Sequence, residues 1–228
     1  MLRDVERCRE IDRARELTSA PEAGGSDQRG SALLVTMLTA VLVSGLAAVL
    51  VVVLSTEEAI EANHRRGVVA LYAADGVLTE VVAELADVPD WQGVLSGSAR
   101  STFSTGPTRV SLADGAVIDL RQETRELQRA IERVGGAETF PRWRLYAWGW
   151  FADLIQASEA GRLMYVAVWV RDDLADPDTD LGLDTNGRVV VRAVVFGPFR
   201  TRRTVEAAIG REGGMVGRVR IVAWGLVR

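Results

Sequence analysis

The chain has 228 residues, of which 48% are hydrophobic and 25% are charged, and its formal net charge is −4. These values suit one globular domain with an anchor, and they argue against a nucleic-acid-binding protein, which needs a clustered basic face. Cys8 is the only cysteine, so a disulfide framework within the chain is excluded.

The first 30 residues are polar and mixed in charge, with six arginines against seven aspartates and glutamates. Residues 2–17 are predicted to form a short helix, because arginine and glutamate recur there at a spacing of three. Residues 19–30, with Pro21 and a Gly-Gly pair, indicate a flexible linker. A secretory signal peptide is a poor fit, since its apolar core spans only about 7–15 residues after a basic region.

Residues 31–54 form an apolar run without a charged side chain. A bilayer core about 30 Å thick is crossed by roughly 20 apolar helical residues, and a helix pairs its backbone groups inside lipid. The run is therefore predicted to be one membrane-spanning helix. Arg29 precedes it, and Glu57 and Glu58 follow it, which favours a cytoplasmic amino terminus. On hydropathy alone, an ordinary single-pass anchor remains an alternative.

The helix is predicted to continue through residues 55–86, which contain no proline. Apolar residues recur there at spacings of three and four and form one stripe. The stripe consists of Leu71, Ala74, Leu78, Val81, Val82 and Leu85. A helix buries such a stripe against other elements, so this half is expected to lie on a globular head.

Two stretches of the long helix resemble a known family. Residues 28–35, Gln-Arg-Gly-Ser-Ala-Leu-Leu-Val, are similar to the cleavage region of type IV prepilins. More narrowly, they resemble the PilX N-terminal family of minor pilins and its relative, the K-type minor pseudopilin of type II secretion. Residues 72–78, Tyr-Ala-Ala-Asp-Gly-Val-Leu, are similar to the A-x-A-E-A-G-L pattern of that family. The resemblance is specific over about residues 29–80 and fainter beyond.

The resemblance implies a processing site. A prepilin peptidase would cut between Gly30 and Ser31 and methylate the new amino terminus at Ser31. Major pilins carry glutamate at the fifth mature position, where this chain has Val35. PilX-like and K-type proteins often lack that glutamate. The departure favours a minor pilin, which in this family primes type IV pilus assembly and sits at or near the tip.

The resemblance also implies partners and a location. The partners would be other minor and major pilins, the prepilin peptidase, the inner-membrane assembly platform and a tip adhesin. The chain would enter the inner membrane with its amino terminus in the cytoplasm and its head in the periplasm. It would then reach the pilus at the cell surface and support adhesion and motility.

The residues after the helix indicate a loop and a hairpin. Residues 91–106 are rich in serine, glycine and threonine and indicate a surface loop with a partly buried Trp91. Residues 110–113 and 116–120 flank an Asp-Gly pair, which is a two-residue hairpin signal. The chain thus enters a mixed α and β region.

A short helix is predicted at residues 123–134, ending at Gly-Gly, and the hydrophobic period then changes to two. The predicted strands are residues 143–148, 163–171, 188–196, 202–209 and 218–224. Five of the six tryptophans lie between residues 143 and 224, and they suit a sheet core better than a ligand-binding aromatic box. In the last strand, Val219 and Ile221 are expected to face inward.

The predicted fold class is α+β. A long amino-terminal helix, transmembrane and then amphipathic, packs on an antiparallel β-sheet head. The resemblance implies the same architecture, that of a type IV pilin. The predicted parts are a leader (1–30), a helix (31–86, with 31–54 in the membrane or the filament core) and a head (87–228).

Residues 172–186 hold the densest acidic patch. Ca²⁺ takes six to eight oxygen ligands, and the candidate ligands are Asp173, Asp176, Asp178, Asp180 and Asp184. The alternate spacing is that of an EF-hand, but Leu181 stands where that loop has glycine, and no glutamate closes it. A calcium site and a solvated acidic loop between two strands both remain open.

Enzyme chemistry is not predicted. The only histidine, His64, lies beside two arginines in the long helix, and no glycine-rich phosphate loop follows a strand. Two non-enzymatic functions besides that of a minor pilin remain open. One is a K-type pseudopilin of a type II secretion filament, although those proteins usually carry a larger added helical domain. The other is a membrane-anchored periplasmic domain that binds a ligand or metal, stays uncut and never enters a filament.

Overall fold

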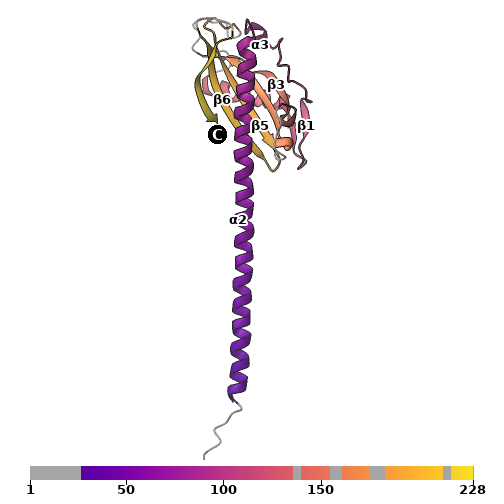
Figure 1. Cartoon of the computed structure of the whole chain (residues 1–228), viewed down its shortest axis with the longest axis vertical. Coiled ribbons are helices and arrows are strands. Elements are labelled where there is room, and N and C mark those ends of the chain that lie inside the picture. The colour runs from indigo at the N-terminus through magenta and orange to yellow at the C-terminus, as the bar shows by residue number, and fades with distance from the viewer. Residues whose placement is uncertain (1–26, 136–139, 155–160, 175–182, 213–216, 228) are drawn as a thin grey trace, which may run out of the picture. The chain divides into compact units, whose positions relative to one another are not determined.

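The computed structural model describes residues 27–135, 140–154, 161–174, 183–212 and 217–227. The chain forms two compact units, residues 1–58 and residues 59–228, and helix α2 (Asp27–Asp87) contributes to both (Figure 1). The short helix predicted at residues 2–17 lies outside the described residues.

Helix α2 begins earlier than the sequence indicates. Residues 19–30 are predicted to be a linker, but residues 27–30 are already helical, so that prediction is wrong at its carboxyl end. Gln28 and Arg29 belong to residue types that favour helix, and a single glycine costs a helix only about 1 kcal/mol relative to alanine. The helix of the apolar run therefore extends back across Gly30.

A five-stranded antiparallel sheet forms the centre of the second unit. Its strands follow one another in space as they do in sequence, in the order β3-β4-β5-β6-β7. They are β3 (Arg144–Trp150), β4 (Tyr165–Asp172), β5 (Arg188–Gly197), β6 (Thr201–Arg211) and β7 (Val219–Val227). All five predicted strands are confirmed, and with the long helix they confirm the α+β class. Short helices α5 (Phe151–Leu154) and η1 (Gly161–Leu163) lie between β3 and β4.

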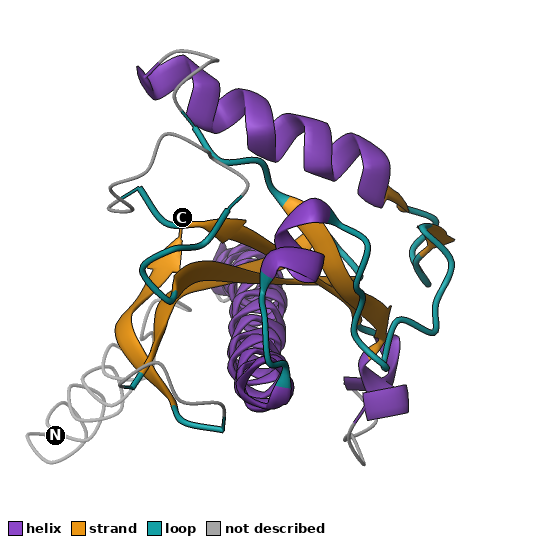
Figure 2. Cartoon of the chain, turned by 90° about the horizontal axis from the view of Figure 1, so that it is seen from above, coloured by secondary structure: helices purple, strands orange, loops and turns teal. Residues whose placement is uncertain are grey.

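The sheet separates two apolar layers. Residues 67–87 of α2 cover one face, and helix α4 (Leu120–Gly135) crosses the other, as Figure 2 shows. The alternating side chains of β4 divide between the layers: Val168 packs with α2, and Trp169 packs with α4. This is the two-sided burial that period-two alternation produces in a central strand.

The predicted apolar stripe of α2 is confirmed. Ala74, Leu78, Val81 and Leu85 are fully buried, and Leu71 and Val82 are partly buried against the same core. Ala70, Ala73 and Ala74 are buried in the same core. At Gly67 a Cβ would lie 2.5 Å from the Arg203 guanidinium, so Gly67 leaves room for that flexible side chain beside the helix.

The hairpin and the short helix predicted for the head are also present. Strands β1 (Arg109–Ser111) and β2 (Val117–Asp119) pair antiparallel and lead directly into α4. The Asp119 carboxylate accepts hydrogen bonds from the backbone N–H groups of Arg121 and Gln122, at 3.0 and 3.2 Å. Asp119 therefore caps the amino end of α4, and these bonds lower its carboxyl pKa.

The region after α2 differs from the predicted surface loop. Residues Gln92–Ser96 form a short helix, α3, and Trp91 is buried rather than partly exposed. The indole N–H of Trp91 donates to the Leu85 carbonyl at 2.9 Å, and the Arg211 guanidinium lies 4.3 Å from its ring centre. Trp91 thus closes the carboxyl end of the helix–sheet core, which serine and glycine content alone could not indicate.

The last strand contradicts one further expectation. Val219 and Ile221 lie on the core side of the sheet, as predicted, but Ile221 is 48% exposed there, and Trp224, which the sequence places in the sheet core, is 51% exposed. The helix-side core includes residues of β4, β5 and β6, whereas β7 contributes only the partly buried Val219. The alternation of apolar and polar residues predicts that residues 218–224 form a strand. It does not show whether that strand lies at the edge of the sheet or beneath the helix.

Candidate functional site

The first candidate site is the apolar surface of α2 itself. Its large apolar side chains between residues 33 and 54 are 46–71% exposed. This is the one helix among the described residues that is long and apolar enough to cross a membrane. A continuous apolar surface of this size is compatible with single-pass membrane anchoring.

The polar side chains in this stretch form bonds within the helix. The Thr36 hydroxyl donates to the Leu33 carbonyl at 2.8 Å, and the Thr39 hydroxyl donates to the Val35 and Thr36 carbonyls at 2.9 Å. A hydroxyl satisfied by its own helix carries little cost in lipid. These threonines are therefore compatible with a lipid or protein environment around the helix.

The predicted processing site lies near the beginning of α2. Gly30 and Ser31 are helical, and a Cβ built on Gly30 meets no atom within 4 Å. A larger side chain would therefore fit there without disturbing the fold. The cut and the methylation remain predictions.

The acidic loop is described only at its two ends. Asp176, Asp178 and Asp180 lie outside the described residues. The Asp173 carboxylate accepts a hydrogen bond from the Asn186 amide at 2.8 Å, and the Asp184 carboxylate accepts from the backbone N–H groups of Gly187 and Arg188. In the described part of the chain no three acidic or metal-binding side chains gather into a cluster. The calcium site thus remains a prediction.

Beside this loop, a charged network lies on the α4 side of the sheet. Arg171 is buried, donates to the Asp172 carbonyl at 2.8 Å, and places its guanidinium carbon 5.0 Å from the Trp143 ring centre. Burial lowers the pKa of Arg171, and the Glu206 carboxylate opposes that shift. Arg192 forms an ion pair with Glu206 at 2.5 Å. Sequence spacing does not indicate this network, because its members come from three strands.

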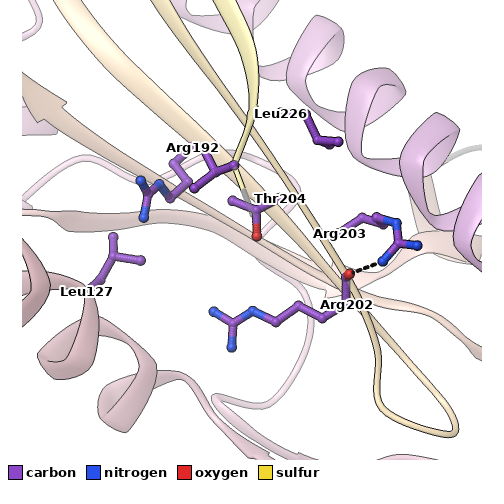
Figure 3. A pocket seen from close by; sticks show the side chains of 7 residues that line it. Leu127, Arg192, Arg202, Arg203, Thr204 and Leu226 are labelled. Atoms are coloured by element: carbon purple, nitrogen blue, oxygen red, sulfur yellow. Dashed lines mark hydrogen bonds between the residues drawn. The ribbon is translucent and has the colours of Figure 1, made fainter.

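A cavity of about 610 Å³ opens next to this network, between α4 and the ends of β6 and β7 (Figure 3). The lining side chains are Leu127, Arg192, Arg202, Arg203, Thr204, Leu226 and Val227. Arg202 pairs with Glu123 of α4 at 2.9 Å, while the Arg203 guanidinium donates to the backbone carbonyl of Arg202 at 2.9 Å (Figure 3). The cavity is basic and partly apolar, and sequence spacing does not reveal it because α4 completes its wall.

Comparison with known proteins identified no relative. No family model matches the chain, and neither a curated protein nor a solved structure is similar to it. The apolar helix, the head and the sequence resemblance are therefore the observations that bear on function.

Proposed function

We propose that this chain is a type IV pilus minor pilin of the PilX-like kind, which primes pilus assembly at or near the tip. The observation that carries the proposal is the composition of α2. An uncharged exposed run is followed in the same helix by a stripe that is buried on an antiparallel sheet. The family resemblance at residues 28–35 and 72–78 adds the cleavage region.

In this proposal the first half of α2 has two successive environments. It lies in the inner membrane after insertion, and it packs among other pilin helices after assembly. Each valine or leucine transferred from water gains about 1.5–3 kcal/mol, so the exposed run strongly favours both apolar environments over water. Partners would be other minor and major pilins, the prepilin peptidase, the assembly platform and a tip adhesin.

The described part of the head favours a pilus subunit over a K-type pseudopilin. The only helix longer than five residues described beyond α2 is α4, with 16 residues. The K-type family usually carries a larger helical addition. A minor pilin and a K-type pseudopilin would both act at the tip of a filament.

A pair of glycine variants tests the processing step. Gly30→Leu should leave a full-length chain when the protein is coexpressed with a prepilin peptidase, because leucine replaces the residue before the cut. Gly45→Leu is the matched control, since both glycines are helical and a Cβ at either meets no atom within 4 Å. The control should be shortened like the native chain, as seen by immunoblot. A Gly30→Leu chain still shortened at Ser31 would refute the proposal.

A further inference from the structure

Strand β7 is an apolar edge of the sheet. Four of its side chains, Ile221, Val222, Trp224 and Leu226, are 46–51% exposed. Residues 223–227, Ala-Trp-Gly-Leu-Val, carry no charge. Edge strands of this kind usually bear charges, proline or a cover, because an open edge recruits another strand. One bulge interrupts β7 near Val222, and the segment after it is regular.

The two edge strands of the sheet, β3 and β7, differ in the backbone hydrogen bonds that their outer sides form. At the β3 edge, the backbone N–H groups of Ser101 and Thr105 donate to the Tyr146 and Trp148 carbonyls, at 2.9 and 3.2 Å. The Ser104 hydroxyl also donates to the Tyr146 carbonyl. Residues 101–105 thus cap β3. Within the described residues, no such backbone hydrogen bond reaches the outer side of β7.

The exposed side chains of β7 extend the helix-side core. Antiparallel partners share a face, and Leu226, Trp224 and Ile221 pair with Val205, Ala207 and Ile209 of β6. Those three β6 residues belong to the core beneath α2. The apolar layer therefore continues onto β7 beyond the cover of the helix, where a further strand could bury it.

The charges around β7 indicate what such a strand must carry. Arg218 and Arg220 lie at its beginning, and Arg203 lies near its end, where Thr204 pairs with Val227; the neighbouring Arg202 is already paired with Glu123 of α4. In the described part of residues 217–227 there is no acidic side chain. A second copy pairing edge to edge, parallel or antiparallel, would bring arginines against arginines, which is unfavourable.

We propose that β7 accepts an extended strand of a different protein, apolar at alternate positions and acidic at both ends. Backbone hydrogen bonds would supply affinity, and the alternate side chains would cover Trp224 and Leu226. The acidic ends would meet the arginines near the two ends of β7. This surface is independent of the proposed cut after Gly30, so either proposal can fail alone.

The test uses the full chain in detergent micelles and a fluorescein-labelled peptide, DEVTVTVED, with binding followed by fluorescence anisotropy. The native chain should bind this peptide. It should bind KKVTVTVKK about tenfold more weakly, because the charge match with the arginines is lost. It should also bind an alternately N-methylated DEVTVTVED about tenfold more weakly, because backbone hydrogen bonds are lost. The double variant Trp224→Lys with Leu226→Lys should weaken binding by a similar factor.

Val117→Lys is the matched control, because Val117 is 52% exposed on β2, outside the five-stranded sheet. It should bind the peptide like the native chain. Circular dichroism checks that each variant is folded, so that a loss of binding does not reflect unfolding. The proposal is overturned if DEVTVTVED fails to bind the native chain or binds the double variant equally. It is also overturned if Trp224→Cys, in a Cys8→Ser background, joins two copies of the chain through a disulfide.

Discussion

Tyr165 shows how a single buried group links the loop before β1 to the sheet. Its side chain is fully buried, and its hydroxyl donates to the Pro107 carbonyl at 2.5 Å. Burial raises its pKa to about 12, above the ordinary tyrosine value of about 10. The unfolded chain therefore releases this proton first. The stabilisation is complete below pH 10 and is lost as the pH rises toward 12.

The sequence makes this effect measurable. The chain contains no lysine, so tyrosines dominate the titration between pH 10 and 12. Tyr165→Phe should lower the free energy of unfolding at pH 7 by about 1 kcal/mol and flatten the loss above pH 10. Burial also raises the pKa of Tyr146, so part of the loss of stability above pH 10 should persist in Tyr165→Phe.

Denaturant unfolding of the full chain in micelles at several pH values checks this prediction. Tyr72→Phe is the control, because that side chain is 73% exposed on α2. It should behave like the native chain. An undiminished slope above pH 10 in Tyr165→Phe would show that Tyr165 does not carry the effect.

At the scale of elements, the packing of α2 on the sheet predicts a difference between two valines of the same helix. Val81 is fully buried, and Val68 is 37% exposed. Val81→Ala should lower the free energy of unfolding by about 2 kcal/mol, through lost burial and a cavity. Val68→Ala should be neutral or slightly stabilising, since alanine is the better helix former. Equal effects in urea unfolding would contradict the described packing.

The elements also show what the sequence could predict. The stripe from Leu71 to Leu85 and the five strands follow from side-chain periodicity, which local geometry imposes. The exposure of Ile221 and Trp224 does not, because it depends on where α2 ends its cover of the sheet. The burial of Trp91 likewise depends on a tertiary contact, with Arg211 of β6.

Of the candidate sites, too, some could be predicted from the sequence and others could not. The uncharged run at residues 31–54 is evident from composition, and its exposure in the structure agrees with an anchor. The basic cavity could not be predicted, since Leu127 and Arg192 meet only when α4 crosses the sheet. The acidic loop remains a prediction, because Asp176, Asp178 and Asp180 lie outside the described residues.

For the whole chain, the proposed function requires that α2 is an assembly element released by processing and not a permanent anchor. Both use the same exposed run, and both are compatible with the packing of residues 67–87 on the sheet. They differ in the covalent state of the amino terminus. A filament subunit of the proposed kind needs the leader removed, whereas an anchored binding domain keeps it.

Mass spectrometry of the amino terminus, on chain extracted from its native membrane, tests this distinction most directly. If the chain is a minor pilin, the extracted protein is expected to begin at N-methylated Ser31. A chain that begins at Met1 would make residues 31–54 a plain anchor and would contradict the proposed filament role.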